Sequence, residues 1–255
     1  MSIYGNATIS NNFEILPGIW QMELYAPQIA AKARPGQFIN LYPNDSTLLL
    51  PRPISLSEIL PESLRIIYRI VGNGTKQFST LQNGSQIKIM GPLGNGFVLP
   101  SSVERSIVIG GGLGIPPLIE LTRRLKGSVE VFLGFRQQPF LVEEFKRSDV
   151  TVHVATQDGC QGYHGNIIGL LEHIAPTGSN VFACGPRPML HSVANWAEQY
   201  DIPAQLSIEE RMACGLGACL GCAIKIRKSY TSDWEYLKVC KDGPVFWGKE
   251  VIWDE

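Results

Sequence analysis

Four cysteines in the last fifth of the sequence restrict the fold more than any other feature. Three follow the spacing Cys-x4-Cys-x2-Cys and one stands further along, at Cys214, Cys219, Cys222 and Cys240. The x4 and x2 intervals are those of plant-type proteins that hold a 2Fe–2S cluster on thiolates. Glycines at positions 215, 217 and 221 keep this loop small, so that backbone N–H groups can approach the sulfurs. The pattern predicts an iron–sulfur site, with Cys240 folded back to complete it.

A structural zinc site is the main alternative, because zinc also binds four cysteine thiolates. Such sites usually take two closely spaced pairs of cysteines, whereas here three are clustered and one is distant. A disulfide framework is typical of short secreted chains, and the sequence start, MSIYGNATISNNF, lacks the basic and apolar stretches of a signal peptide. We therefore expect a cluster in preference to zinc, disulfides or ordinary buried cysteines.

Charge and hydrophobicity exclude several kinds of partner. Among 255 residues, 22 are Lys or Arg and 23 are Asp or Glu, so the formal net charge is −1. A balance so close to neutral gives no electrostatic surface for nucleic acid or for an anionic membrane. No uncharged apolar run reaches the roughly 18 residues that a membrane-spanning helix needs. We expect a soluble, cytoplasmic protein with neither nucleic acid nor membrane as a partner.

The order of apolar runs and turn residues predicts three parts and a β plus α/β fold class. Residues 1–102 contain short strands separated by Gly, Pro and Asn, as expected of an antiparallel β-barrel. Residues 103–205 alternate strands with helices of roughly ten residues, which is typical of βαβ units with a parallel sheet. Residues 206–255 carry the cysteines and two short strands, AIKIRKS and YLKVC, that suit a hairpin. Ser207 and Glu210 stand at capping-box spacing, a sign of a helix start.

The predicted barrel carries residues with the chemistry to bind a flavin. In the segment Arg52–Ser55 (sequence RPIS), the guanidinium can meet a phosphate while the hydroxyl reaches the ring. The turn Gly72–Thr75 adds free N–H groups that can cradle a pyrophosphate, and Ile67–Arg69 lies just before it. An arginine at a strand edge is more often simply solvated, and the glycines also suit a plain turn. The flavin interpretation therefore depends on these segments occurring together.

Two glycine-containing loops predict a dinucleotide site in the second part. Residues 110–114 (GGGLG) follow a buried strand and precede a helix, although Ile115 and Pro117 occupy positions where a third glycine of the usual fingerprint would fall. Residues 184–189 (CGPRPM) follow a later strand of the same predicted sheet. Dinucleotides bind at the carboxyl edge of open parallel sheets, and both loops are expected at that edge.

Over essentially the whole chain, these motifs resemble one known family. The order RPIS, GT, GGGLGIPP, CGPRPM, EERMACGLGACLGC and KVCKDGPVF resembles that of the electron-transfer subunits of two-subunit, NAD-linked bacterial dihydroorotate dehydrogenases. These subunits are members of the ferredoxin reductase-like superfamily. Many reductases of that superfamily carry an aromatic residue where Ile54 stands here, so the sequence departs from the pattern at that flavin contact.

The resemblance implies a set of cofactor-binding residues. FAD is implied on the barrel, bound by Arg52, Pro53, Ile54, Ser55, Ile67, Tyr68, Arg69, Gly74 and Thr75. NAD(H) is implied at Gly111, Gly112, Gly114, Cys184, Gly185 and Pro186. The 2Fe–2S cluster is implied on Cys214, Cys219, Cys222 and Cys240. No residue is expected to act as a general acid or base, because the carriers supply the chemistry.

The resemblance also implies a partner and a pathway. Dihydroorotate is oxidised on the FMN of a separate catalytic subunit, and its electrons pass through 2Fe–2S and FAD to NAD+, in pyrimidine (UMP) biosynthesis. By the same resemblance, two catalytic and two electron-transfer chains are expected to form a heterotetramer. The cysteine-rich loop is expected to form part of the interface, with charge from Glu209, Glu210 and Arg211.

Other functions share these motifs. A flavin and iron–sulfur NAD(P)H reductase subunit of a hydrogenase or sulfite reductase assembly would have the same three parts. A non-enzymatic module would dock through a zinc-bound tail and sense NAD(H) through its glycine loops. A stand-alone flavin reductase is less favoured, because the cysteine tail would then have no electron partner.

Overall fold

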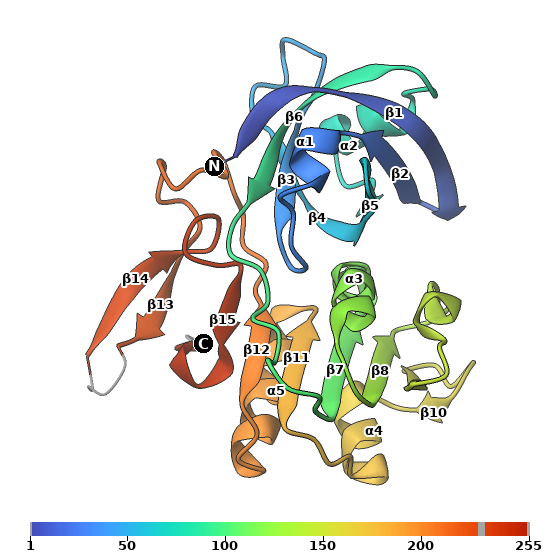
Figure 1. The fold of residues 1–255 in the computed structure, drawn as a ribbon, viewed down its shortest axis with the longest axis vertical. Helices are drawn as coiled ribbons and strands as arrows, with labels where there is room; N and C mark the ends of the chain where they lie inside the picture. Colours follow the sequence, from blue (N-terminus) through green and yellow to red (C-terminus); the bar gives the residue numbers. More distant parts are fainter. Residues whose placement is uncertain (1, 229–232, 254–255) are drawn as a thin grey trace.

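The first six strands close into an antiparallel barrel, drawn from blue through cyan to the green of β6 in Figure 1. The computed structural model describes residues 2–228 and 233–253. The order around the barrel is β1-β2-β5-β4-β3-β6. Its strands are β1 (Ile3–Leu16), β2 (Ile19–Tyr25), β3 (Phe38–Tyr42), β4 (Arg52–Ile59), β5 (Ser63–Arg69) and β6 (Gln86–Leu93), and its short helices are α1 (Pro27–Ala30) and α2 (Asn73–Ser79).

Alternating side chains explain why this segment forms a barrel. Along β6 buried residues alternate with more exposed ones, so that Ile87 and Ile89 point into the interior. Leu24 and Leu64 join them there from other strands. Strands β1 and β2 meet at Gly18, whose φ of 77° lies in the left-handed region that glycine adopts without strain. The predicted antiparallel barrel is confirmed.

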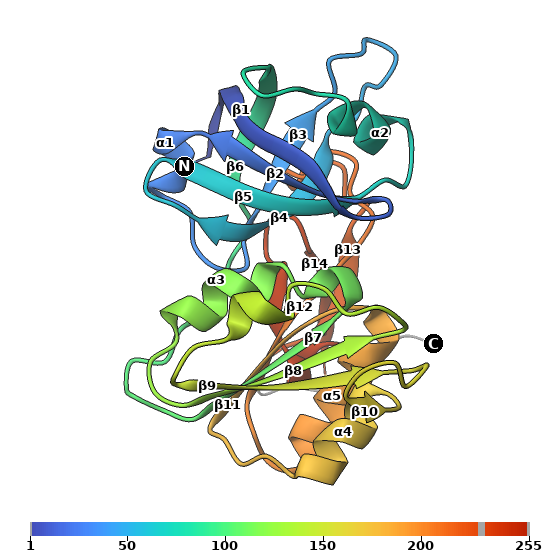
Figure 2. The same cartoon turned by 90° about the vertical axis from the view of Figure 1, so that its right-hand side faces the viewer.

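Helix α3 lies between the barrel and a seven-stranded sheet (Figure 2). The strand order is β10-β9-β8-β7-β11-β12-β15, and each neighbouring pair is parallel except the last. The elements are β7 (Ser106–Gly111), β8 (Val129–Phe135), β9 (Val150–Thr156), β10 (Tyr163–His164), β11 (Asn180–Cys184), β12 (Ala204–Ser207), α3 (Pro117–Arg124), α4 (Ile167–Ile174), α5 (Arg187–Gln199), and the 3-10 turns η1 (Gly112–Gly114) and η2 (Val142–Phe145). Strand β7 is buried along its whole length, as its apolar sequence predicts. The predicted parallel sheet is confirmed.

The carboxyl-terminal tail packs against both the sheet and the barrel (Figure 1). Strands β13 (Ala223–Arg227) and β14 (Trp234–Lys238) form the predicted hairpin. Strand β15 (Val245–Trp247), followed by the 3-10 turn η3 (Gly248–Glu250), pairs with β12 and extends the sheet. No helix within the described residues is long and apolar enough to cross a membrane.

The helix start indicated by Ser207 and Glu210 is wrong. Ser207 is the last residue of β12, where it pairs with Cys184 on one side and Val245 on the other. Glu210 instead forms an ion pair with Arg187 of α5 at 2.6 Å. Sheet pairing on both sides of Ser207 therefore overrides the local signal.

Four charged side chains join the barrel to α3 and η2 of the second part of the chain. Glu58 and Arg65 come from β4 and β5, Arg123 comes from α3, and Glu144 comes from η2. Arg65 bonds to Glu58 at 2.7 Å and to Glu144 at 3.0 Å. Arg123 bonds to the same two carboxylates and reaches Glu144 at 3.0 Å. The closed network fixes the carboxyl end of α3 against the barrel.

Replacing Glu144 is expected to make stability less dependent on pH. A hydrogen bond from Arg65 holds the pKa of Glu144 below its usual value, against the opposing effect of burial. A carboxyl with a lowered folded-state pKa stabilises the fold above its unfolded pKa of about 4.3, and the stabilisation is lost as the pH falls through the folded value. In thermal unfolding, Glu144→Gln should therefore be less stable than the wild type at about pH 7, and the difference in unfolding temperature should narrow only as the pH falls below about 4.

Glu143→Gln is the matched control. Glu143 is the neighbour of Glu144, but its carboxylate pairs with Lys146 on the exposed surface. This variant should stay close to the wild type at every pH, since exposed pairs contribute little. If the difference in stability between Glu144→Gln and the wild type does not change with pH, the lowered pKa of Glu144 would be contradicted.

Candidate functional site

The hairpin brings the four predicted ligands into one region. Cys214 and Cys219 lie in the loop between β12 and β13 (residues 208–222, the cysteine loop), Cys222 ends this loop, and Cys240 follows β14. Because β13 and β14 pair antiparallel, Cys222 and Cys240 meet at the open end of the hairpin. The amide of Cys240 donates to Cys222 Sγ at 3.4 Å. The distant cysteine thus returns to the cluster of three.

Backbone N–H groups point at the sulfurs of this region. The amide of Leu216 donates to Cys214 Sγ at 3.3 Å, and the amide of Gly217 donates to Cys240 Sγ at 3.0 Å. Gly215 and Gly217 have φ of 66° and 81°, and this left-handed backbone turns the loop around the sulfurs. Such donors stabilise negative charge on metal-bound thiolates.

The same surroundings set the protonation of the thiols. Partial burial disfavours the thiolate of Cys214, but hydrogen bonds from the backbone of Leu216 and Cys219 outweigh it and lower the pKa of Cys214 to about 6. Burial, together with the neighbouring Cys222 thiol, raises the pKa of Cys240 to about 12. A metal ion deprotonates a coordinating thiol outright, so bound iron would hold Cys240 as a thiolate.

The donor set fits an iron–sulfur cluster. In residues 2–228 and 233–253, no group of three or more His, Cys, Asp or Glu side chains is arranged to hold one metal ion. A 2Fe–2S cluster distributes its four ligands over two irons, so they need not converge on one point. Four thiols, of which three accept a backbone N–H, match that chemistry.

Arg52 and the Gly72–Thr75 turn form one corner at the edge of the barrel. The guanidinium of Arg52 covers Gly74 so closely that a Cβ there would lie 2.6 Å from Nε. Nη1 of Arg52 donates to the carbonyl of Leu50 at 2.6 Å. Thr75 Oγ1 accepts the amide of Val71 at 3.0 Å and so fixes the turn. A cation and a glycine turn in contact make a corner suited to the phosphates of FAD.

The other predicted flavin residues follow β4 and β5. Pro53, Ile54 and Ser55 are half-buried along β4, Ile67 is buried, and Arg69 is exposed at the end of β5. Tyr68 points into the barrel, where its hydroxyl donates to Asn12 Oδ1 at 3.3 Å, and burial raises its pKa above the usual range. Only the backbone of Tyr68 is therefore available to a molecule outside the barrel.

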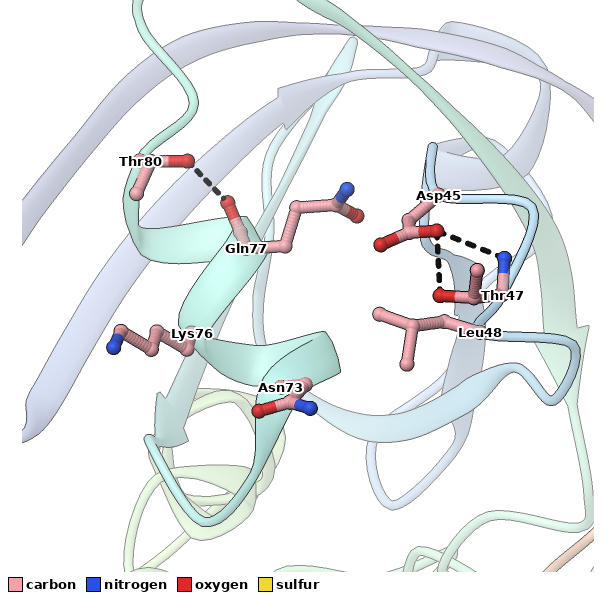
Figure 3. A pocket seen from close by; sticks show the side chains of 7 residues that line it. All are labelled: Asp45, Thr47, Leu48, Asn73, Lys76, Gln77 and Thr80. Carbon is pink, nitrogen blue, oxygen red and sulfur yellow. Dashed lines mark hydrogen bonds between the residues drawn. The ribbon is translucent and has the colours of Figure 1, made fainter.

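A hollow of about 320 Å³ adjoins this corner (Figure 3). It lies between α2 and the loop before β4, and it is lined by Asp45, Thr47, Leu48, Asn73, Lys76, Gln77 and Thr80. Thr47 donates to Asp45 Oδ1 at 2.7 Å, and this bond lowers the pKa of Asp45. The hollow offers an ionised acceptor, a cation and an apolar wall, which suit a nucleoside. Apart from Asn73, which lies within the Gly72–Thr75 turn, these residues belonged to no motif in the sequence.

The two glycine-containing loops touch at the carboxyl edge of the sheet. A Cβ on Gly114 would lie 2.4 Å from the carbonyl carbon of Cys184, and one on Gly111 would lie 3.1 Å from the ring of Pro186. A Cβ on Gly185 would lie 3.2 Å from the amide nitrogen of Gly111, whereas nothing lies within 4 Å of one on Gly112. Burial raises the pKa of Cys184 to about 12, so its thiol is neutral near pH 7. The loops are placed together as expected for a dinucleotide site.

One buried polar residue contacts the cysteine loop without having been indicated by the sequence. Asn40 lies in β3 and is fully buried, and its Nδ2 donates to the carbonyl of Cys214 at 3.0 Å. The available signal was a single polar residue inside the apolar run FINLY.

A barrel with a flavin corner, a sheet with paired glycine loops and a four-cysteine tail together define a reductase-type electron-transfer protein. Residues 209–252 match the family described as the iron-sulfur cluster binding domain of dihydroorotate dehydrogenase B. The fold is similar to a chain in the structure of NADH-dependent reduced ferredoxin-NADP oxidoreductase, with a TM-score of 0.85 at 24% identity over 97% of this chain and 90% of that one. It is also similar to the ferredoxin reductase in carbazole 1,9a-dioxygenase, with a TM-score of 0.64 at 18% identity over 79% and 67%.

Relatives of similar length identify the particular family. The dihydroorotate dehydrogenase B (NAD(+)) electron transfer subunit of Caldanaerobacter subterraneus subsp. tengcongensis is 39% identical over 87% of this chain and 88% of its own length. The protein of the same name from Streptococcus mutans is 38% identical over 100% of both chains. The chain belongs to the family of dihydroorotate dehydrogenase B electron transfer subunits, which confirms the resemblance inferred from the motifs.

Proposed function

We propose that this chain carries electrons from the oxidation of dihydroorotate to NAD+, as a step of pyrimidine synthesis. The carrying observation is the contact between the cysteine loop and the barrel, made by Asn40 and Cys214 at 3.0 Å. It joins the cysteine loop to β3, which pairs with the flavin segment of β4, in a chain whose relatives are named electron transfer subunits. FAD, when bound, exchanges the electron pair of a hydride for single electrons.

The chain's own residues bind and position the carriers in this proposal. The four cysteines hold the cluster, and Arg52 with Gly74 and Thr75 holds the phosphates of FAD. Gly111–Gly114 and Cys184–Pro186 receive NAD(H) at the sheet edge. The neutral thiol of Cys184 packs between strands and does not act as a nucleophile. We assign residues 1–102, 103–205 and 206–255 to the FAD, NAD and cluster units.

We further propose an FMN-containing catalytic subunit as the partner, in an assembly of two plus two chains. A cytoplasmic location is consistent with the six free thiols, since reducing compartments preserve them. The alternative is a reductase subunit of a hydrogenase or sulfite reductase assembly. In such an assembly the electrons would not come from dihydroorotate.

Anaerobic purification tests the proposal in two stages. The visible spectrum, with iron and sulfide assays, should show flavin and about two irons and two sulfides per chain. With its coexpressed catalytic subunit, the chain should then reduce NAD+ when dihydroorotate is added. Zinc without sulfide would reject electron transfer. Flavin and cluster without dihydroorotate-dependent NADH would favour another complex.

Charge reversal beside the cysteine loop is expected to weaken partner binding. Glu209 and Arg211 are exposed there, next to the exposed apolar side chains of Leu216 and Leu220. Glu209→Lys and Arg211→Glu should each weaken association by about tenfold at low salt and less at high salt, with an unchanged visible spectrum. Surface plasmon resonance with the catalytic subunit measures this.

Glu210 is a poorer choice, because its reversal also breaks the pair with Arg187. Lys126→Glu is the control, since it lies in the exposed turn before β8, at the opposite edge of the sheet. Unchanged association in both test variants would remove this surface from the interface.

A further inference from the structure

Asn40 is a polar side chain buried between two of the proposed cofactor sites. It has no exposed surface, and its strand neighbours Ile39 and Leu41 are apolar and fully buried. Its Nδ2 donates to the carbonyl of Cys214 at 3.0 Å. Its Oδ1 is buried and has no hydrogen-bond partner among the described residues.

The cysteine loop lies directly on this amide. A Cβ on Gly215 would lie 2.5 Å from Nδ2 and 2.6 Å from Oδ1 of Asn40. Gly215 has a φ of 66°, so glycine serves both the left-handed turn and the close approach. The backbone around Cys214 is therefore located by Asn40.

The other side of Asn40 belongs to the barrel. In the antiparallel pairing of β3 with β4, Asn40 stands opposite Pro53, and in its pairing with β6 it stands opposite Met90. Pro53 is part of the RPIS segment assigned to FAD. One residue thus contacts a cluster ligand through its side chain and pairs with a flavin segment through its backbone.

Stability alone does not account for an asparagine at this position. The bond from Nδ2 satisfies the carbonyl of Cys214, but the buried Oδ1 has no donor, and this cost offsets the gain from that bond. The side chain lies where the cysteine loop contacts β3, the strand that pairs with the flavin segment of β4. A positioning role accounts for both observations.

We propose that Asn40 is a positioning residue that holds Cys214, and with it one edge of the cluster, at a fixed separation from the flavin segment of β4. The proposal rests on the proposed function, because it needs both carriers in this chain. Electron transfer between them depends on this separation, and Asn40 acts through Cys214 without touching substrate.

Two substitutions test the role. Asn40→Leu keeps the volume and removes the donor, whereas Asn40→Asp keeps the shape and, neutral at this buried position, can still donate through its O–H. Asn95→Leu is the matched control, because Asn95 makes the same kind of contact from the barrel to the tail, donating to the carbonyl of Asp242 at 2.9 Å.

The full chain is purified anaerobically, and three properties are measured. These are thermal stability, FAD and iron content with the electron paramagnetic resonance spectrum of the reduced cluster, and the rate at which NADH reduces the cluster. We expect Asn40→Leu to unfold at about the wild-type temperature, because it removes the unsatisfied Oδ1 but also the donor to the Cys214 carbonyl. It should keep full FAD, show an altered resonance spectrum and have cluster reduction slowed by about tenfold or more. Asn40→Asp should show a smaller spectral change than Asn40→Leu, because its O–H can replace the amide donor, and Asn95→Leu should match the wild type.

Loss of the cluster with full retention of FAD would also support the proposal, because it would show that Cys214 is displaced. A wild-type spectrum and reduction rate in Asn40→Leu would overturn it, and so would loss of stability and FAD together. These outcomes are separate from failure of the proposed function, in which the wild type itself would lack iron and sulfide.

Discussion

Cys240→Ser is expected to leave a chain that binds FAD and holds almost no iron. Cys240 is only 2% exposed, its sulfur accepts the amide of Gly217 at 3.0 Å, and its own amide contacts Cys222. A serine hydroxyl is far harder to deprotonate than a thiol and is a poor ligand for iron in this setting. Iron and sulfide should fall from about two per chain to less than about a tenth of that.

In Cys240→Ser, flavin activity should show whether the rest of the molecule remains intact. Cys240 lies in the tail, whereas the Arg52 corner lies on the barrel, so NADH-dependent reduction of a dye that accepts electrons from flavin should stay within about twofold of the wild type. Transfer to or from the catalytic subunit should be lost. Visible spectra with iron, sulfide and flavin assays on the anaerobic protein measure these quantities.

Cys160→Ser is the matched control. Cys160 is exposed in the loop after β9, where its amide donates to Asp158 at 3.1 Å. It should keep the full cluster. Full iron in Cys240→Ser, or loss of iron in Cys160→Ser, would refute the ligand assignment. If the wild type holds zinc and Cys240→Ser loses it, the cysteines would still be assigned as ligands, but the metal they bind would be zinc instead of iron.

The features predicted from the sequence are those whose information is local. The cysteine spacing lies within nine positions, and the hairpin that returns Cys240 is marked by two short apolar strands. The two glycine loops directly follow buried strands, and their meeting at the carboxyl edge of the sheet was predicted in the same way. Each depends on a few adjacent residues, so tertiary packing had little to override.

The features that the sequence did not predict depend on distant pairing. Asn40 and Cys214 are 174 positions apart, and no periodicity connects them. Strand β15 has only three residues, and it is a strand because β12 offers it an edge. The network of Glu58, Arg65, Arg123 and Glu144 combines four separate elements. The same dependence explains why the signal at Ser207 failed.

Gly74→Ala is expected to remove most of the bound FAD without unfolding the barrel. The new Cβ would lie 2.6 Å from Nε and 2.8 Å from Cζ of Arg52, so the guanidinium must leave the corner. These are the end atoms of a flexible side chain and alanine favours a helix, so the fold should tolerate the change. A charge-assisted hydrogen bond is worth about 1.5–3 kcal/mol, and losing it should weaken FAD binding by about 10- to 100-fold.

Gly72→Ala provides a control from the same turn. Nothing lies within 4 Å of a Cβ at Gly72, and its φ of −176° is extended backbone that alanine adopts freely. FAD titration of the apoprotein, followed by flavin fluorescence, should give wild-type affinity for Gly72→Ala and weak binding for Gly74→Ala, with similar unfolding temperatures. If both variants bind FAD with equal affinity, Arg52 does not contribute to FAD binding. Loss in both would show that the turn acts through its backbone, since Arg52 is undisturbed by the change at Gly72.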